Sequence, residues 1–342
     1  MRAADPVGPL TATRALALAG AALTVGALRR RRTIVAVPPE LRTPNLWLPL
    51  AVGNSLALAI GRRLFLRATE PVAGVAVARH DVPGGRDVFV YEPTGRPRPS
   101  GALLWIHGGG FILGTPEGDH ELCSRIARDL GIVVVSTRYR LAPEHPFPAG
   151  LDDCVAALRW LHDSAAGLGV DGMRIAVGGG SAGGGMAAAV AQRATDEQIS
   201  VAFQLLVYPM LDDRTVLRRD HGGTGRLVWT PRSNAYAWTS LLGHRPDGAD
   251  PRPYAVPARR EDLSGLPPAW IGVGSLDLFR DEDLAYARRL EEAGVPVAVV
   301  VEPGMYHAAE LELHTTVPSM RAFQQAMFDA LAAGLGSAAG VR

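Results

Sequence analysis

Short apolar runs alternate with amphipathic stretches along most of this 342-residue chain, and this alternation limits the possible folds more than any other feature. The runs at 102–106 and 132–136 are apolar almost throughout, which is typical of strands buried on both faces. The alternation predicts an α/β protein whose mainly parallel central sheet is flanked by helices on both faces. We expect strands at 87–91, 102–106, 132–136, 174–177, 203–208, 269–273 and 295–301, and helices at 119–130, 151–163, 182–195 and 281–293.

Composition and charge exclude several kinds of partner. Hydrophobic residues make up 47% of the chain and charged residues 20%, so it can bury a large core. A formal net charge of +1 gives no reason to expect nucleic acid as a partner. The two cysteines, Cys123 and Cys154, lack the spacing of a metal site or a disulfide framework. We therefore expect two ordinary buried thiols, no metal and no organic cofactor.

A glycine-rich segment, Gly179-Gly-Ser-Ala-Gly183, matches the pattern G-x-S-x-G and lies between an expected strand and an expected helix. Glycines around the serine allow a turn that is too sharp for larger residues. Such a turn places the serine hydroxyl at the sheet edge, beside the N-terminus of a helix that favours negative charge. A glycine-rich helix start without catalytic function is the alternative, but the context favours Ser181 as a nucleophile.

A second glycine cluster, His107-Gly-Gly-Gly110, follows the expected strand 102–106. Acyl transfer needs hydrogen-bond donors for the oxyanion, and consecutive glycines expose backbone N–H groups at close approach. Segments of this kind supply such donors in lipases and esterases, together with the N–H that follows the nucleophile, here that of Ala182. A mobile turn is the alternative. We expect His107 to form hydrogen bonds within the loop rather than to act as a base.

Asp277 and His307 complete an order of Ser, Asp and His along the chain. Each of these residues follows a different expected strand, and the carboxyl ends of parallel strands lie at one edge of the sheet. We therefore predict a catalytic triad with Ser181 as nucleophile, His307 as general base and Asp277 as the acid that orients it. The neighbouring acids Asp281 and Glu282 are expected to begin the next helix.

Two stretches lie outside the alternation, residues 1–70 and about 214–255. Insertions near the carboxyl edge of a sheet commonly build lids over the ligand site. We predict that 1–70 is an N-terminal helical cap segment, that 71–342 is the catalytic domain, and that 214–255 is a second cap insertion.

The N-terminal stretch contains two short apolar runs, Ala15–Leu28, which is followed by Arg29–Arg32, and Leu46–Ile60. Both are shorter than a span of the bilayer, and the charge pattern is not that of a signal peptide. A hydrophobic lid is the favoured interpretation. Attachment of residues 10–66 to a membrane surface is the alternative, since apolar helices flanked by arginine can lie in the interface.

Taken in order, six segments resemble the hormone-sensitive-lipase-like family of bacterial carboxylesterases, over about residues 80–315. They are HGGGF at 107–111, YRLAPEHPFPA at 139–149, GGSAGG at 179–184, YPMLDD at 208–213, GSLDLFRDE at 274–282 and the loop that ends at His307. The resemblance implies an α/β-hydrolase fold with a partly N-terminal helical cap, short- to medium-chain acyl esters as substrates, and no cofactor. It also implies Gly109, Gly110 and Ala182 as the oxyanion donors.

The chain departs from the family pattern on both sides of the expected site. Gly180 stands where Asp or Thr usually precedes the nucleophile, and Ala308 and Ala309 follow the histidine where an aromatic residue is often found nearby. Neither change removes a triad atom, so both bear on substrate preference.

These features predict a serine carboxylesterase that acts on a small-molecule ester through an acyl-enzyme. We assign Phe111, Trp229 and Trp238 to the substrate pocket, and expect Arg138 and Glu144 to form an ion pair that braces the neighbouring loop. An aryl amide or formamide hydrolase of the same fold is the first alternative, and a non-catalytic receptor the second. We expect a cytoplasmic protein, with attachment to the inner face of the membrane as the alternative, and leave a homodimer open.

Overall fold

The computed structural model describes residues 25–48, 51–64 and 68–336. It falls into two compact units, Met1–Pro49 and Leu50–Arg342. Most of the apolar run Ala15–Leu28 lies outside the described residues.

In the described part of the smaller unit, a helix is followed by two short turns. Residues 25–35 are helical, and the turns η1 (Pro39–Leu41) and η2 (Pro44–Trp47) follow. Arg30 on the helix donates from Nε to the carbonyl oxygen of Leu46 at 2.6 Å. This side chain therefore ties the helix to the second turn.

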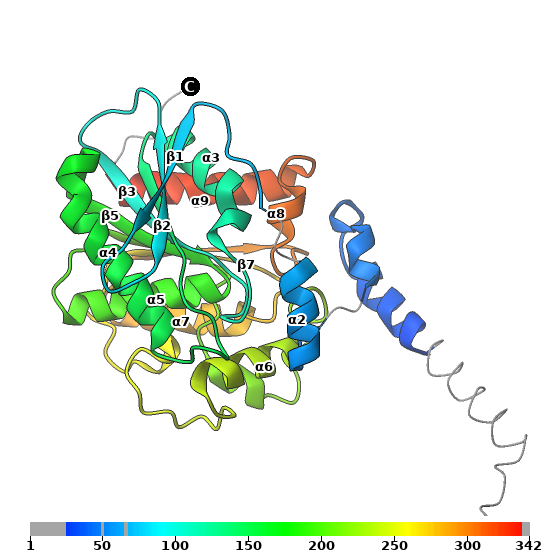
Figure 1. The fold of residues 1–342 in the computed structure, drawn as a ribbon. Coiled ribbons are helices and arrows are strands. Elements are labelled where there is room, and N and C mark those ends of the chain that lie inside the picture. The colour runs from blue at the N-terminus through cyan, green and yellow to red at the C-terminus, as the bar shows by residue number, and fades with distance from the viewer. Residues whose placement is uncertain (1–24, 49–50, 65–67, 337–342) are drawn as a thin grey trace, which may run out of the picture. The chain divides into compact units, whose positions relative to one another are not determined.

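One sheet of eight strands forms the centre of the larger unit, in the order β1-β2-β4-β3-β5-β6-β7-β8 (Figure 1). The strands are β1 (Val75–Asp81), β2 (Asp87–Pro93), β3 (Ser100–Ile106), β4 (Val133–Thr137), β5 (Val170–Gly180), β6 (Phe203–Val207), β7 (Ala269–Gly274) and β8 (Val297–Glu302). β2 runs antiparallel to both of its neighbours, and the other six strands, β3 to β8, run parallel to one another. The predicted mainly parallel sheet is thus confirmed, and β1 is an additional edge strand.

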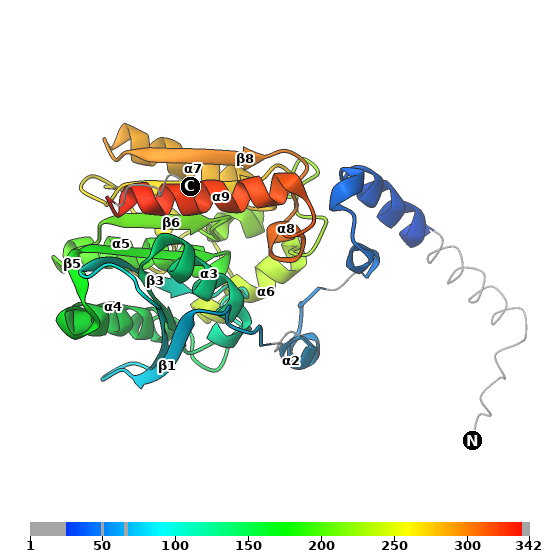
Figure 2. The same cartoon turned by 90° about the horizontal axis from the view of Figure 1, so that it is seen from above.

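Helices cover both faces of this sheet (Figure 2). One face carries α3 (His120–Leu130) and α9 (Pro318–Gly334), which contact each other. The other carries α4 (Ala149–Leu168), α5 (Ala182–Asp196) and α7 (Arg280–Glu292). α7 begins one residue before Asp281, which confirms that Asp281 and Glu282 open a helix.

Two further helices lie side by side near the carboxyl edge of the sheet, α2 (Ser55–Leu64) and α6 (Pro231–Leu242) (Figures 1 and 2). The backbone N–H of Val52, just before α2, donates to the hydroxyl of Ser233 on α6 at 3.1 Å. α2 belongs to the larger unit, and the segment just before it contacts the insertion at 214–255.

Arg62 fastens α2 to the rest of the larger unit. Its guanidinium donates to the carbonyl oxygens of Ile112 and Ala142 at 2.8 and 3.0 Å, and forms a bidentate pair with Glu144, with the shorter contact at 2.7 Å. A bidentate arginine–carboxylate pair fixes orientation as well as distance. These contacts hold α2 in one position over the turn that carries Glu144.

The predicted ion pair between Arg138 and Glu144 is wrong. Arg138 follows the end of β4, beside the first residue of β2, and its guanidinium pairs with Asp87 at 3.1 Å and with Glu117. Glu144 lies beyond the next turn and faces Arg62 instead. Sequence proximity suggested the pair, but strand pairing places Arg138 beside Asp87.

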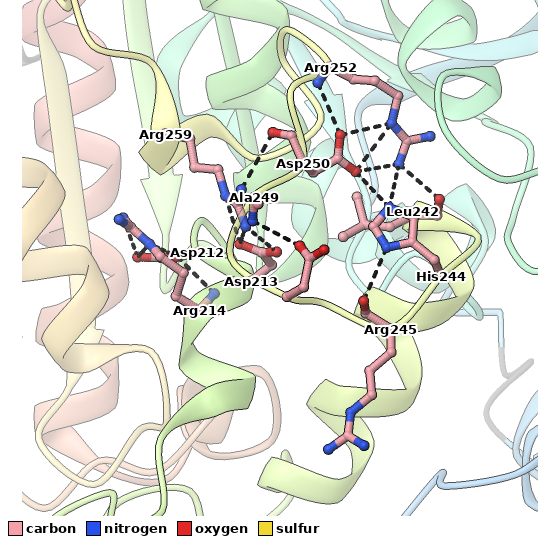
Figure 3. A network of polar contacts seen from close by, with 11 residues as sticks. Asp212, Asp213, Arg214, Leu242, His244, Arg245, Ala249, Asp250, Arg252 and Arg259 are labelled. Atoms are coloured by element: carbon pink, nitrogen blue, oxygen red, sulfur yellow. Dashed lines mark hydrogen bonds and ion pairs between the residues drawn. The ribbon is translucent and has the colours of Figure 1, made fainter.

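Arginine–aspartate pairs hold the ends of the insertion (Figure 3). Arg259 contacts both carboxylate oxygens of the fully buried Asp213 at 2.6 Å. Asp250 accepts from Arg252 Nε at 2.9 Å, while Nη2 of Arg252 donates to the carbonyl oxygen of Leu242 at the end of α6. The two segments that flank the insertion are therefore joined at its base, and Arg252 ties its end to α6.

Both cysteines are free and buried, as expected. Within the described ranges, no helix has the length and apolar character needed to cross a membrane.

Candidate active site

Ser181 occupies a strained turn between β5 and α5. Its φ is 58°, in the left-handed region that side-chain-bearing residues rarely adopt. A Cβ on Gly179 would lie 2.5 Å from the carbonyl oxygen of Ile106, and one on Gly183 would lie 2.0 Å from the same atom. The close approach of the end of β3 therefore requires glycine at both positions, which explains the G-x-S-x-G spacing.

The three predicted triad side chains meet at the carboxyl edge of the sheet. Nε2 of His307 lies 2.9 Å from Oγ of Ser181, and Nδ1 lies 2.8 Å from Oδ2 of Asp277. Asp277 is fully buried, and its Oδ1 accepts from the backbone N–H of Phe279 at 3.0 Å. This chain of contacts can move a proton from the serine to the imidazole and stabilise the imidazolium that results.

Aromatic rings surround the imidazole of His307. Tyr208 and Phe279 meet it edge to face, with ring centroids at 4.9 and 5.4 Å, and the ring of Trp229 lies at 6.3 Å. Packing on several sides restricts rotation of the imidazole. A side chain that acts as a general base needs such a fixed alignment with its proton donor.

The loop after β3 contains two positions that favour glycine. Gly109 and Gly110 have φ values of 112° and 61°. A Cβ on Gly109 would lie 2.0 Å from the carbonyl oxygen of Leu113, and one on Gly110 would lie 2.2 Å from the ring of Trp229. Both glycines line the same cavity as Ser181. Their N–H groups are therefore near the position where a substrate carbonyl would bind.

His107 is held inside this loop. Its Nδ1 lies 2.8 Å from the carbonyl oxygen of Gly108, and its ring stacks on Tyr139 with centroids 4.4 Å apart. Burial lowers the pKa of His107 to about 4, so the ring is neutral at pH 7. These contacts support the expected structural function of His107.

A cavity of about 400 Å³ opens beside Ser181 and His307. Trp229 from the insertion and Val52 from the segment before α2 are among its lining residues. Phe111 and Trp238, which we also assigned to the pocket, do not line it. They are buried and pack against each other with centroids 5.4 Å apart, because the inner face of α6 points into the core. The assignment of these two residues to the pocket is corrected accordingly.

Among the polar side chains of the cavity that sequence reasoning missed are Tyr208, Asp119 and Glu310. Tyr208 follows β6, and Glu310 lies three residues after His307, so their positions after strands were a usable signal. No signal in the sequence marked Asp119, because this residue lies before an amphipathic helix, where acids are common. Within the part of the chain that the structure describes, no group of three or more His, Cys, Asp or Glu side chains could hold a metal ion.

Comparison with known families places residues 103–311 in a family described as alpha/beta hydrolase fold. Two curated relatives come from Mycobacterium tuberculosis. The chain is 39% identical over 217 residues to esterase LipI, and 40% identical over 218 residues to carboxylesterase NlhH. These matches cover 61% and 60% of this chain and 66% and 65% of the relatives. The matched segment thus spans slightly less than two thirds of each relative.

A solved structure described as a bacterial heroin esterase is similar over a longer part of the chain. It superimposes with a TM-score of 0.80 and 36% sequence identity, and the match covers 89% of this chain and 99% of that one. The likeness therefore includes regions outside the segment that the curated relatives match.

Proposed function

Because the chain belongs to the alpha/beta hydrolase fold family, we propose that it is a carboxylic ester hydrolase with a serine nucleophile. The resemblance to hormone-sensitive-lipase-like carboxylesterases is confirmed by the family match and by relatives that are named esterases. The observation that carries the proposal is the unbroken chain of short contacts from Ser181 Oγ through His307 to Asp277.

In the first half of the reaction, His307 takes the proton of Ser181 as the hydroxyl oxygen attacks the ester carbonyl. Asp277 stabilises the imidazolium that forms. The backbone N–H groups of Gly109, Gly110 and Ala182 bind the oxyanion of the tetrahedral intermediate. Collapse expels the alcohol, which receives its proton from His307, and leaves an acyl group on the serine.

In the second half, water replaces the alcohol. His307 takes a proton from the water as it attacks the acyl-enzyme, and the same N–H groups bind the second oxyanion. Release of the acid restores Ser181. Every proton in this cycle moves between the reactants and one imidazole, so the chemistry needs no group beyond the residues named.

The cap supplies the substrate pocket in this proposal. Val52 and Trp229 line the cavity from the segment before α2 and from the insertion, and Arg62 holds α2 against the body. A cavity of about 400 Å³ suits a short- to medium-chain acyl ester.

The proposal is tested by replacing the nucleophile. Ser181→Ala should lower kcat for p-nitrophenyl esters by about 10⁴-fold or more, leaving the contribution of binding and the oxyanion donors. Ser240→Ala is the matched control, because this hydroxyl bonds to the carbonyl of Tyr236 within α6 and does not line the cavity. Turnover of Ser181→Ala close to that of the control would refute the proposal. Preference for an aryl-amide panel over the esters would identify an amidase instead.

A further inference from the structure

Two carboxyl groups line the cavity without taking part in the proposed reaction. Glu310 lies on α8 (Ala309–Leu313), three residues after His307, and Asp119 ends the turn η3 (Pro116–Asp119) just before α3. Carboxylates are costly in a largely apolar cavity unless something compensates their charge. Their presence beside the reaction centre therefore requires an explanation.

Glu310 is only partly satisfied by the protein. It is 3% exposed, and its Oε1 is hydrogen-bonded to the hydroxyl of Tyr208. Its Oε2 is buried and has no partner among the described residues. Burial raises the pKa of Glu310 to about 7, even though the Tyr208 hydroxyl acts in the opposite direction. A buried acceptor left without a donor is the kind of group that a ligand can satisfy.

Asp119 has an unusual position for an acid at the start of a helix. It is the N-cap residue of α3, but its side chain does not cap the helix. Its Oδ2 instead accepts from the indole Nε1 of Trp105 at 2.7 Å. Burial raises the pKa of Asp119 to about 6. The side chain is thus directed to the cavity wall formed by Trp105 rather than to the helix end.

The carboxyl groups of Glu310 and Asp119 both influence the hydroxyl of Tyr208. Burial and the negative charges of Glu310, Asp119 and Asp277 together raise the pKa of the Tyr208 hydroxyl. None of the described residues that line the cavity is arginine or lysine, and the low pKa of His107 keeps that ring neutral. The rings of Trp105, Tyr208 and Trp229 are also part of the wall, and aromatic faces attract cations.

We propose that the cavity recognises esters that carry an ammonium group, bound between the carboxylates of Glu310 and Asp119 and against the neighbouring aromatic rings. This inference rests on the proposed ester hydrolysis and specifies its substrate class. The ammonium charge would offset the two carboxylates, and a tertiary ammonium N–H would also satisfy Oε2 of Glu310.

The test uses pairs of esters that differ only in charge. One pair is choline butyrate and 3,3-dimethylbutyl butyrate, in which carbon replaces the quaternary nitrogen of the alcohol. The other pair consists of two p-nitrophenyl esters that differ by the same replacement at the end of the acyl chain. The assay uses the full-length protein at pH 8. In at least one of the two pairs, kcat/KM should be about tenfold or more higher for the cationic ester than for the neutral one. A tenfold difference corresponds to one favourable charge interaction.

Amide variants of the two acids should remove this preference. Glu310→Gln and Asp119→Asn should each lower the cationic-to-neutral ratio of kcat/KM several-fold. Glu121→Gln is the matched control, since this carboxyl lies on α3 two residues after Asp119, is 42% exposed and does not line the cavity. The control should retain the ratio.

The outcomes separate the two proposals. Hydrolysis of neutral esters with a ratio near one in both pairs overturns the cation site and leaves the esterase intact. An equal loss on both members in Glu310→Gln would show that Glu310 positions His307 instead. Failure to hydrolyse any ester refutes the proposed function itself.

A measurement without variants covers the case in which the substituted proteins do not fold. Butyltrimethylammonium should inhibit hydrolysis of the neutral ester competitively, at a concentration about tenfold lower than its uncharged carbon isostere. Equal inhibition by the two compounds would overturn the inference.

Discussion

Asp277 shows how a buried carboxylate can hold an imidazole ring in one orientation. Its two oxygens have separate partners, the imidazole Nδ1 of His307 and the backbone N–H of Phe279. The second contact fixes the carboxylate plane, so the first can select the tautomer in which Nε2 is free to accept from Ser181. The orientation of the imidazole thus depends on one carboxylate and the rings around it.

Asp277→Asn should keep the fold but lower kcat for p-nitrophenyl esters by about 10⁴-fold, because an amide no longer fixes the tautomer. Asp281→Asn removes a nearby acid at the start of α7 whose side chain is 44% exposed, and should change kcat little. Steady-state kinetics on both variants, with circular dichroism to check folding, make the comparison. A larger loss in Asp281→Asn would place the functional acid elsewhere in this loop.

The meeting of Ser181, Asp277 and His307 at one edge of the sheet was predictable from the sequence, because each of them follows an expected strand. The walls of the pocket were not. Phe111 and Trp238 were chosen as aromatic residues near the expected site, but whether a ring faces a cavity or the core depends on the rotation of its helix or turn. Trp229 faces the cavity and Trp238, nine positions later, faces the core.

At the scale of elements, the apolar pattern identified seven strands, among them β8, whose side chains are not buried, and missed β1. β1 pairs with β2 along its whole length, but its side chains are largely exposed, so no core pattern marked it. α9 was missed for a different reason. Its buried residues recur every three or four positions, from Met320 through Phe323 and Met327 to Leu331, and this periodicity was available in the sequence.

The insertion depends on ion pairs that no sequence pattern revealed. The side chain of Asp250 is fully buried between Arg252 and His244. Hydrogen bonds from Arg252 hold the pKa of Asp250 well below its usual range. A depressed pKa in the folded state means that the carboxylate stabilises the fold at neutral pH. That contribution is lost as the pH falls below the unfolded value, which is about 3.9.

Asp250→Asn should therefore lower the free energy of unfolding at pH 7 by about 1–3 kcal/mol. The difference from the parent should shrink below about pH 4, by up to about 1.4 kcal/mol for each pH unit. Urea unfolding at pH 7, 5, 4 and 3 measures it, with the exposed Asp247→Asn as control. A difference that stays constant over this range would show that shape rather than charge holds Asp250 in place.

At the scale of the whole molecule, the two compact units divide the N-terminal stretch that the sequence presented as one cap. The helix α2 lies in the larger unit, where Arg62 and Val52 connect it to the body and to α6. The helix at 25–35, with Arg29–Arg32, lies in the smaller unit. Apolar composition is shared by both segments, so it could not separate a lid from a segment with another function.

Two truncations distinguish these functions. A variant that lacks residues 1–50 keeps Val52 and α2, so its preference among p-nitrophenyl esters of different chain length should match that of the full-length protein. A variant that begins at Val72 also loses Val52 from the cavity wall and the contacts of Arg62. Its chain-length preference should change, and its solubility should fall as the covered apolar surface becomes exposed.

Liposome flotation of the full-length protein completes the experiment. If the smaller unit bound a membrane surface, Arg29–Arg32 would contribute about 1 kcal/mol for each charge near anionic headgroups, and salt would weaken the binding. We expect no flotation with vesicles of anionic lipid. Two results together would contradict the cap hypothesis and establish a membrane-binding segment. They are salt-sensitive flotation that is lost on removal of residues 1–50, and unchanged selectivity in the variant that begins at Val72. A change in selectivity only when α2 is removed would locate the cap in α2, because α2 is the one described helix that differs between the two variants.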